Sequence, residues 1–597
     1  MCGIMGYIGD ENATDIIISG LEELEYRGYD SAGLAVENGG KIKVAKIVGS
    51  PSGLRDEAKN LTGHIGIGHT RWATHGAPTV DNAHPHTSQS GLFTVVHNGI
   101  IENYAELKKE LSENGFDFKS DTDTEVVAQM LEYLYSGDLK GTVSAVLSRL
   151  KGSYALGILC RDYPDSIICA KLSSPLFVGV SSGCVFLASD VSALAEKSDR
   201  IFRVNDGEIG ILKKDGLKIF DLDGCRIRKS EIKIKSCDRN SDKGGYKHYM
   251  LKEIMEQPAA IRRTLSDIIG ENGRIKFKGL HLAKHDIEDI DHVVFVACGS
   301  AYHVGAVGAY TCERLFKRHS QAVLASEFRY MHPHLDENTL VVIISQSGET
   351  ADTLAAMRIA EENGAKVIGI VNVENSTIAQ ECRNVIMTRA GKEVAVATTK
   401  AYSAQLAVVY TLALRLAEIS GGISRAEADK YINELKTIPD KIEMLLSDTE
   451  KIKPFAEAAN SSGYICFIGR GLDYCTATEA SLKLKEISYI PCEAYAAGEL
   501  KHGTISLIDK ESLTVALCGS NELKSKTFSN VNEVKARDGR IITVADADAD
   551  IIIPETIDLF TPMLEIIPMQ LLAYYTALSR GCPIDKPRNL AKSVTVE

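Results

Sequence analysis

Three apolar, strand-like segments occur twice in the second half of the chain, in the same order and at nearly the same spacing. VVFVACGS, LVVIISQS and KVIGIV begin at residues 293, 340 and 366, and YICFIGRG, LTVALCGS and RIITVA begin at residues 464, 513 and 540. Each segment precedes a helix-like run, and the two copies are offset by 171 to 174 residues. The repeat therefore predicts two copies of one α/β unit. Continuous apolar strands such as LVVII are typical of a buried parallel sheet.

The first part of the chain, residues 2–235, has a different pattern. Short apolar runs alternate with Gly, Asn and Asp turns, and helical patterns lie near residues 12–25 and 102–134. This alternation predicts stacked sheets with helices on the outside. The polar segment SCDRNSDKGGYKH (236–248) is the predicted linker. The predicted boundaries that follow are 249–430 for the first α/β copy, 431–587 for the second and 588–597 for an extended tail, with a connecting helix at about 420–450.

Composition narrows the class of protein. The chain has 597 residues, 44% hydrophobic and 25% charged, as expected for several ordinary globular domains. A net charge of -13 argues against nucleic-acid or anionic-membrane binding, and no apolar run is long enough for a membrane span. The 14 cysteines are scattered and no CxxC pair occurs, which predicts reduced thiols, a cytoplasmic location and no structural zinc.

Cys2 directly follows the initiator methionine in MCGIMGYIGD. Removal of Met1 would leave a cysteine with a free α-amino group, whose ordinary pKa of about 7.7–8.0 suits a general base toward its own thiol. The alternative is a small buried thiol with a packing role. Position alone does not decide between the two interpretations.

Four polar motifs follow Cys2 in order: HTRWATHG (69–76), NAHPH (82–86), HNGIIEN (97–103) and TDTEV (122–126). Arg71 can form a forked pair with a carboxylate, and Asp123 can bind an ammonium group. Asn98 carries a side-chain NH2, and Gly99 allows a backbone N–H to approach a developing oxyanion. Together they would hold an amino acid by both ends while its side-chain amide is attacked.

CGIMGYIG, YRGYDSAG (26–33), HTRWATHG and HNGIIEN resemble the glutaminase domain of N-terminal-nucleophile amidotransferases over residues 2 to about 235. The resemblance implies an αββα sandwich of the class II glutamine amidotransferase type. Cys2 would then attack the glutamine amide, with Asn98 and Gly99 forming the oxyanion hole. The glutamine-binding residues that it implies are Arg71, Trp72, Thr74, His75 and Asp123.

Two features of this region allow a second interpretation. Six of the 15 histidines fall between residues 64 and 97, but their spacing lacks helical i,i+4 pairs and carboxylate partners, so structural or substrate-lining roles are favoured and no metal is expected. Trp72, the only tryptophan, is either a packing residue or, as the resemblance implies, a gate between the glutamine pocket and an ammonia channel.

The motif SQSGET (345–350) follows a buried strand and opens a helix. Helix N-termini bind anions, and Ser345, Ser347 and Thr350 add hydroxyl donors, which favours a phosphate site over simple helix capping. The chain contains no GxxxxGK[ST] motif, so ATP use is not expected. The equivalent loop of the second copy, CGSNE (518–522), has fewer hydroxyls, so the first copy is expected to hold the anion.

The second copy contains a candidate acid–base pair in EASLKLKEISYI (479–490). Lys483 and Glu486 are three residues apart on one predicted helix, either as a surface ion pair or as catalytic groups. A Glu can move a proton between two sugar carbons. His502, in a Gly-flanked loop, suits sugar-ring opening, and Lys592 in the tail can form a Schiff base with a ketone.

SEFRY (326–330), SQSGETADT, LKLKEISYI, AYAAGELKHG and RNLAKSVTVE resemble the paired sugar-isomerase (SIS) domains of the glutamine–fructose-6-phosphate aminotransferase (isomerizing) family. The resemblance implies flavodoxin-like αβα domains. Lys592 would be the Schiff-base lysine, Glu486 the isomerising base, Lys483 an auxiliary group and His502 a ring-opening group from the neighbouring subunit of a homodimer. The phosphate-binding residues that it implies are Ser300, Ser345, Gln346, Ser347 and Thr350. Ala301 departs from the family pattern, which has a serine there.

The expected reaction converts L-glutamine and D-fructose 6-phosphate to L-glutamate and D-glucosamine 6-phosphate without a cofactor, with ammonia passing internally. The resemblance makes this the first step of hexosamine and UDP-N-acetylglucosamine synthesis. A glutamine-dependent SIS enzyme acting on a different sugar phosphate is the alternative.

Overall fold

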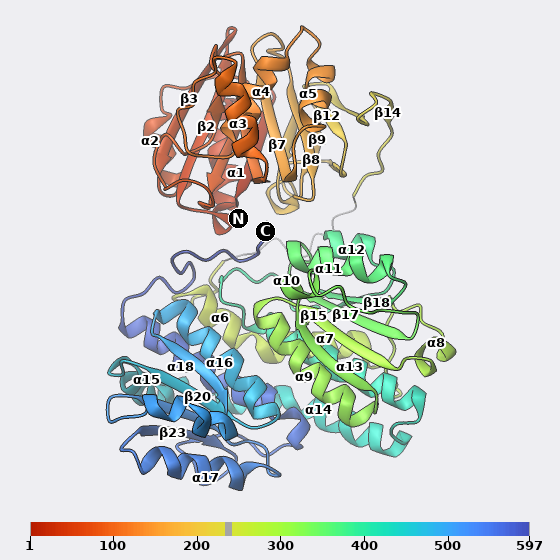
Figure 1. Ribbon diagram of the computed structural model, residues 1–597, viewed down its shortest axis with the longest axis vertical. Coiled ribbons are helices and arrows are strands. Elements are labelled where there is room, and N and C mark those ends of the chain that lie inside the picture. Colours follow the sequence, from red (N-terminus) through yellow and green to blue (C-terminus); the bar gives the residue numbers. More distant parts are fainter. Residues whose placement is uncertain (1, 233–241, 596–597) are drawn as a thin grey trace. The chain divides into compact units, whose positions relative to one another are not determined.

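The computed structural model describes residues 2–232 and 242–595, so part of the predicted linker, 236–241, lies outside the described residues. The chain forms two compact units, which are described separately (Figure 1). The first comprises Met1–Cys237 with Ser593–Glu597, and the second comprises Asp238–Lys592.

The first unit is a sandwich of two antiparallel seven-stranded sheets, in the orders β11-β9-β10-β1-β4-β2-β3 and β14-β13-β12-β8-β7-β6-β5. The strands of the first sheet are β1 (Gly3–Ile8), β2 (Ser31–Asn38), β3 (Lys41–Val48), β4 (Ile65–Arg71), β9 (Phe177–Ser181), β10 (Cys184–Ala188) and β11 (Arg200–Arg203). Those of the second are β5 (His86–Thr87), β6 (Phe93–Ile101), β7 (Gly152–Cys160), β8 (Ile167–Leu172), β12 (Ile209–Lys213), β13 (Gly216–Phe220) and β14 (Arg226–Ile227).

Strand β1 shows why this unit has four layers. All six of its residues are buried, because both faces of the strand are covered. Ile4 and Ile8 point into the core between the two sheets, whereas Met5 and Tyr7 point into the core beneath α1 (Ala13–Glu23), as the two-residue period of a strand requires. The helices α3 (Tyr104–Glu113), α4 (Glu125–Leu134) and α5 (Leu139–Leu147) cover the outer face of the second sheet, and α2 (Leu54–Glu57) is a short helix beside β3. The predicted αββα sandwich is confirmed.

The second unit contains two parallel five-stranded sheets, in the orders β16-β15-β17-β18-β19 and β21-β20-β22-β23-β24. Both orders read 2-1-3-4-5, which is the flavodoxin-like arrangement. The predicted repeat is confirmed: its segments form β15 (His292–Ala297), β17 (Thr339–Ser345) and β18 (Lys366–Val371) in one copy, and β20 (Ile465–Gly469), β22 (Leu513–Leu517) and β23 (Arg540–Ala545) in the other. The remaining strands are β16 (His319–Leu324), β19 (Val385–Met387), β21 (Cys492–Ala496) and β24 (Ile551–Ile552).

Helices flank both sheets of this unit. In the first half they are α6 (Tyr249–Met255), α7 (Gln257–Ile268), α8 (Lys284–Glu288), α9 (Gly299–Leu315), α10 (Ala325–Phe328), α11 (Ala351–Glu362), α12 (Thr377–Glu381) and α13 (Lys400–Ser420). In the second half they are α15 (Lys453–Asn460), α16 (Leu472–Ser488), α17 (Lys524–Lys535) and α18 (Thr561–Ser579). The predicted connecting helix is α14 (Arg425–Leu446), which begins with a Ser424–Glu427 capping box.

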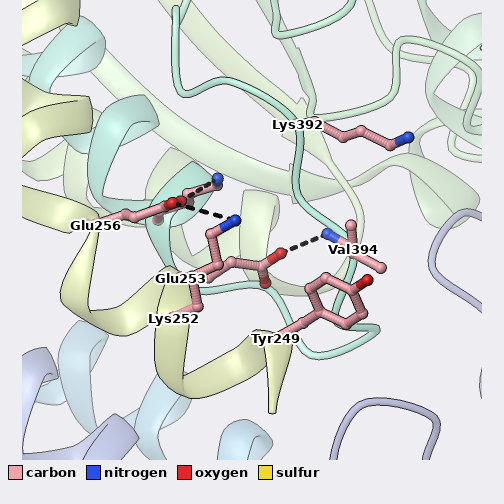
Figure 2. Close-up of a pocket in the computed structure, with 7 residues that line it drawn as sticks. Tyr249, Lys252, Glu253, Glu256, Lys392 and Val394 are labelled. Atoms are coloured by element: carbon pink, nitrogen blue, oxygen red, sulfur yellow. Dashed lines mark hydrogen bonds and ion pairs between the residues drawn. The ribbon is translucent and has the colours of Figure 1, made fainter. Parts of the chain in front are cut away.

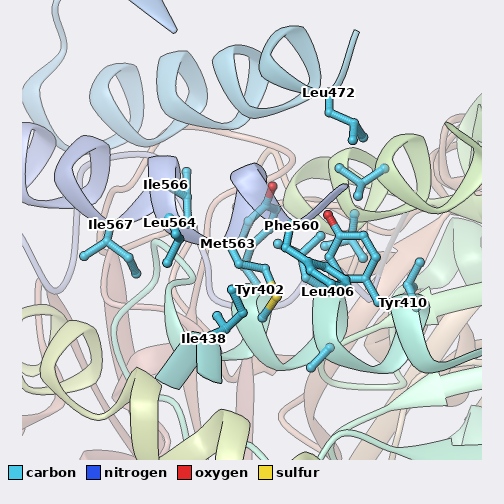
Figure 3. Close-up of a cluster of buried hydrophobic side chains, with 14 of the residues drawn as sticks. Tyr402, Leu406, Tyr410, Ile438, Leu472, Phe560, Met563, Leu564, Ile566 and Ile567 are labelled. Carbon is cyan, nitrogen blue, oxygen red and sulfur yellow. The ribbon is translucent and has the colours of Figure 1, made fainter. Parts of the chain in front are cut away.

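The two repeats share one hydrophobic core. Tyr402, Leu406 and Tyr410 of α13 belong to the same buried cluster as Leu472 of α16 and residues at the start of α18 (Figure 3). The Tyr410 ring packs edge-on against Phe560, with 4.9 Å between centroids. The same cluster includes inward-facing residues of both sheets, such as Phe295 and Phe467. Because neither sheet has a separate core on this side, the two repeats are expected to fold and unfold together.

No helix among the described residues has the length and apolar character needed to cross a bilayer. In the same part of the chain, no group of three or more His, Cys, Asp or Glu side chains is arranged to hold a metal ion.

Leu406→Ala tests the shared core. Leu406 is fully buried, so we expect a loss of about 2–5 kcal/mol in the free energy of unfolding of the second unit. Amide hydrogen exchange should show reduced protection in both β17 and β22. The matched control is Met444→Ala, an exposed position on α14, where the change should stay within about 0.5 kcal/mol. Reduced protection confined to β17 would show that the repeats do not share their stability.

Candidate active sites

Cys2 lies immediately before β1, in the first unit. Its Sγ accepts a hydrogen bond from the backbone N–H of Trp72, with 3.3 Å between the two atoms, where the chain leaves β4. The side chain is half-buried. Burial raises the pKa of the Cys2 thiol above its usual value, while the Trp72 N–H and the charge of Arg71 act in the opposite direction. A general base is therefore needed to form the thiolate at neutral pH.

Asn98 and Gly99, on β6, lie beside the nucleophile. The Asn98 side-chain amide nitrogen donates to the Cys2 carbonyl oxygen at 3.0 Å. Gly99 has φ +137°, and a Cβ atom there would lie 2.0 Å from the Ser153 carbonyl oxygen. Only glycine fits, so the backbone at residue 99 keeps a conformation that other residues rarely adopt.

Arg71 shapes the loop that follows β4. Its buried guanidinium donates to the carbonyl oxygens of Gly76 (3.1 Å) and Ala77 (3.4 Å), and also to that of His75. In this loop Trp72 and His75 are half-buried, and Thr74 is exposed. The loop therefore gathers four of the predicted glutamine-binding residues next to Cys2.

Asp123, the fifth predicted glutamine-binding residue, is buried, and its carboxylate accepts from the Ile101 backbone N–H at 2.7 Å. Sequence reasoning did not single out Asp30, whose carboxylate accepts from the Ala73 N–H at 2.8 Å and so anchors the same loop. Asp30 lies in YRGYDSAG, a motif used only for its resemblance, and a single carboxylate in a turn carries no stronger local signal.

The SQSGET loop joins β17 to α11. Ser345 Oγ lies 3.0 Å from Thr350 Oγ1 and accepts from the Gly348 backbone N–H at 3.0 Å. Gly348 has φ +65°, and a Cβ there would lie 2.1 Å from Ser376 Oγ. The Gln346 carbonyl oxygen accepts from the Asn372 N–H at 3.1 Å. This compact turn places Ser345, Gln346, Ser347 and Thr350 together at the carboxyl end of a parallel strand and the N-terminus of a twelve-residue helix.

The equivalent loop of the second copy already holds the protein's own carboxylates. Asp558 accepts from the Asn521 and Glu522 N–H groups and from Ser520 Oγ, each at 3.1 Å. Asp473 accepts from the Ser520 N–H at 3.2 Å, and Glu565 accepts from the Gly519 N–H at 2.9 Å. These donors are therefore occupied in the second copy.

On α16, Lys483 is buried and its partner Glu486 is half-buried, so the surface ion-pair interpretation does not apply. Lys483 Nζ lies 2.5 Å from Glu486 Oε2 and 3.5 Å from Glu479 Oε1, and the Lys483 side chain is 1% exposed. Burial acts to lower the pKa of Lys483, but the two carboxylates outweigh it and raise that pKa. Burial also raises the pKa of Glu486, against the opposing effect of Lys483.

Glu479 connects this pair to the first repeat. Ser300 Oγ donates to Glu479 Oε1 at 2.8 Å, and His303 Nδ1 lies 2.7 Å from Glu479 Oε2. Ser300, predicted to bind phosphate, therefore points toward a carboxylate of the second copy. Glu479, Lys483 and Glu486 have the i, i+4, i+7 spacing of one helix face, a signal that would have identified Glu479.

Lys592 is ion-paired with Glu393, and both side chains are nearly or fully buried. Glu393 also accepts from Thr398 Oγ1 (2.6 Å) and from the N–H groups of Thr399 (2.9 Å) and Ala401 (3.0 Å). Although burial acts to raise it, Lys592 and these donors lower the pKa of Glu393 to about 2. The predicted Schiff-base lysine is thus held by a fixed carboxylate of the first repeat.

Glu253 of α6 supports the loop that carries Glu393. Its carboxylate accepts from the Val394 N–H at 2.5 Å beside a cavity of about 20 Å³ (Figure 2). Glu256, on the same wall of the cavity, forms ion pairs with Lys252 (3.7 Å) and Lys400 (2.6 Å). Burial and the nearby negative charge of Glu393 raise the pKa of Glu253 to about 8.

His502 is exposed at the end of the short 3-10 helix Ala497–His502. Among the contacts of the described residues, none joins it to Lys483 or Glu486. The structure therefore brings Lys483 and Glu486 together and leaves His502 outside that pair within one chain.

Comparison with known proteins covers both halves. Residues 69–196 match the glutamine amidotransferase domain, and residues 286–415 and 460–580 match the SIS domain. Over the full length of both chains, this chain is 49% identical to the glutamine–fructose-6-phosphate aminotransferase (isomerizing) of Caldanaerobacter subterraneus and 43% identical to that of Thermus thermophilus. The chain belongs to this aminotransferase family.

A solved structure supports the same assignment for the SIS half. The C-terminal domain of glucosamine-fructose-6-phosphate aminotransferase from Francisella tularensis is 38% identical and covers 58% of this chain and 100% of that chain, with a TM-score of 0.55. The family assignment agrees with the resemblance found in the motifs, and it covers both the glutaminase sandwich and the paired parallel sheets.

Glu253→Gln tests the electrostatics around the Lys592–Glu393 pair of this aminotransferase. Glu253 has a folded-state pKa of about 8 against an ordinary value of 4.5. Between these values the folded state binds the proton more tightly than the unfolded state, so wild-type stability falls as pH rises through this window. We expect the Tm advantage of Glu253→Gln over wild type to grow from pH about 5 to pH about 8.

The matched control for Glu253→Gln is Glu271→Gln, at an exposed position, where the Tm should change little at any pH. If the Tm difference between Glu253→Gln and wild type stays constant from pH about 5 to pH about 8, the raised pKa of Glu253 is contradicted.

Proposed function

We propose that this chain transfers the amide nitrogen of L-glutamine to D-fructose 6-phosphate, giving L-glutamate and D-glucosamine 6-phosphate. The observation that carries the proposal is the end-to-end relationship to aminotransferases of this name, at 49% identity over 100% of both chains. The same alignment spans Cys2 at one end and Lys592 at the other, so one chain holds candidates for both half-reactions.

In the first half-reaction, removal of Met1 frees the α-amino group of Cys2, which takes the thiol proton. The thiolate attacks the glutamine side-chain carbonyl carbon, and the oxyanion accepts hydrogen bonds from the Asn98 side chain and the Gly99 N–H. Collapse of this intermediate returns the proton to the leaving nitrogen, releases ammonia and leaves a thioester, which water hydrolyses to glutamate. Arg71 and Asp123 hold the α-carboxylate and α-ammonium groups, with Trp72, Thr74 and His75 lining the pocket.

In the second half-reaction, the SQSGET hydroxyls and helix N-terminus hold the sugar phosphate. The Lys592 amine forms a Schiff base at C2 of the open-chain ketose with loss of water, and ammonia then displaces the lysine to give the C2 imine. Glu486 removes a proton from C1 and returns it at C2, while the imine nitrogen gains a proton and the C1 hydroxyl loses one, which yields the 2-amino aldehyde. Lys483, which lies 2.5 Å from the Glu486 carboxylate, positions that base.

Three further features belong to this proposal. Ammonia passes from one half-reaction to the other inside the protein, with Trp72 as the gate. The enzyme is a homodimer in which His502 of the neighbouring subunit opens the sugar ring. A cytoplasmic location is supported by the cysteines of the described residues, which are all free thiols.

Cys2→Ala should abolish glutaminase chemistry. We expect glutamate production in the presence of fructose 6-phosphate to fall by at least about 1,000-fold, because no other group supplies the nucleophile. Fructose 6-phosphate should still raise the Tm of the variant, as it does for wild type. Intact mass and N-terminal sequencing complete the test, since an active preparation that retains Met1 would contradict the N-terminal mechanism.

Glu486→Gln should impair only the sugar half. We expect glucosamine 6-phosphate formation to fall by about 100- to 10,000-fold, the usual contribution of a general base, while glutamine hydrolysis changes only a few-fold. The matched control is Glu450→Gln, which breaks an exposed Lys453–Glu450 pair of the same i,i+3 spacing. If Glu486→Gln forms the amino sugar at the wild-type rate, the base is elsewhere. An amino sugar formed only from another phosphosugar would favour a different substrate.

A further inference from the structure

His69, on β4, is fully buried and takes no direct part in the proposed reaction. Its Nε2 lies 2.9 Å from the His97 carbonyl oxygen and 3.1 Å from the Asn98 side-chain oxygen. The other end of the Asn98 amide contacts the backbone of the nucleophilic residue, because its nitrogen donates to the Cys2 carbonyl oxygen at 3.0 Å. His69, Asn98 and Cys2 thus form one chain of hydrogen bonds through the centre of the sandwich.

The tautomer of His69 follows from its partners. Both atoms near Nε2 are oxygen acceptors, so Nε2 must carry the hydrogen. The buried Nδ1 has no hydrogen-bond partner among the described residues. Burial lowers the pKa of His69 to about 3, so the ring is neutral throughout the physiological range. A neutral ring with the hydrogen on Nε2 is a fixed donor at this position.

A fixed donor determines the orientation of the Asn98 amide. With the oxygen of Asn98 toward His69, its NH2 group faces Cys2, where an oxyanion would form. Rotating the amide by 180° would place NH2 against the His69 N–H and oxygen against the Cys2 carbonyl. That arrangement leaves buried polar groups unpaired and like dipoles in contact, which is costly away from water.

The His84 ring packs directly on His69, and two further histidines nearby are bonded to threonines. The His84 ring stacks on the His69 ring with 4.1 Å between centroids and an interplanar angle of 19°. His97 Nδ1 lies 2.8 Å from Thr124 Oγ1, and His86 Nε2 lies 3.0 Å from Thr122 Oγ1. Four histidines of the sequence cluster therefore have protein partners inside the sandwich.

We propose that His69 is a positioning residue of the glutaminase site, and that its Nε2–H fixes the Asn98 amide with the NH2 group directed at the oxyanion. The proposal rests on the proposed function, because it assumes that Asn98 stabilises the oxyanion. His69 itself does not touch the substrate. Its contribution is to keep the Asn98 amide from turning its oxygen toward the oxyanion, so that the NH2 group is available in the transition state.

Two substitutions of His69 separate positioning from packing. In His69→Gln, the amide nitrogen reaches the position of Nε2 and can donate to both oxygens. In His69→Asn, the side chain is shorter and its nitrogen reaches only the position of Nδ1. Both replacements are polar, uncharged amides, so they share the loss of the imidazole ring and differ in where the donor lies. The control is His64→Gln, which replaces an exposed histidine just before the same strand and lies outside the buried histidine cluster.

The measurement is glutamate formation by the full-length chain with fructose 6-phosphate present. For His69→Asn we expect kcat to fall by about 10- to 100-fold, part of the effect of losing an oxyanion-hole donor, with KM for glutamine within about three-fold of wild type. His69→Gln and the control His64→Gln should stay within about three-fold of wild type in kcat. The rate at which iodoacetamide alkylates Cys2, followed by peptide mass, should be similar in all variants, because thiol reactivity does not depend on the orientation of Asn98.

Equal activity of His69→Gln and His69→Asn, whether both are high or both are low, would overturn the positioning role and leave a packing role. A slower Cys2 alkylation that parallels the loss of kcat would also overturn it. Failure of the proposed function has a separate signature. In that case wild type releases no glutamate from glutamine, or Asn98→Ala retains wild-type kcat.

Discussion

The second unit depends on one hydrophobic core that both parallel sheets share. Tyr402 and Leu406 of α13 pack with Leu472 of α16 and Phe560 near α18, so the helices of each repeat cover residues of the other. This packing also places α9 of the first repeat against α16 of the second. The polar contacts of Glu479 with Ser300 and His303 form at that junction. The candidate acid–base pair is therefore supported from both repeats, and neither repeat alone contains the complete arrangement.

The sequence alone was sufficient to predict the features that depend on local pattern. Strand β17 is buried on both faces, so LVVIIS reads as an uninterrupted apolar run, and the order of such runs revealed the repeat. The stacked sheets of the first unit and the SQSGET turn could be predicted for the same reason, since alternation, glycine positions and strand ends are visible in consecutive residues. The specific αββα arrangement was implied by the family resemblance. Family resemblance then supplied the roles of individual residues.

Contacts between distant residues could not be predicted in this way. Glu393 and Lys592 are 199 positions apart, and Ser300 and Glu479 are 179 apart, so no periodic pattern relates them. The histidines near residue 69 show a different limit. Their number was evident, but the role of each depends on which atoms face each ring nitrogen, and only the tertiary structure shows that His69 meets two oxygens. Residue type alone permits a ligand, a base or a fixed donor at that position.

The contrast between the two repeats explains why a duplicated fold would carry a single phosphate site. A loop between a parallel strand and a helix N-terminus offers backbone N–H groups, which favour an anion in either copy. In the second copy, Asp558 supplies that anion from within the chain, with Asp473 and Glu565 bound to adjacent N–H groups. A phosphate would have to displace carboxylates that are already hydrogen-bonded and partly or fully buried, which removes most of the gain from binding. The two repeats therefore offer different groups: the first has the hydroxyl-rich turn, and the second has Lys483 and Glu486 on α16.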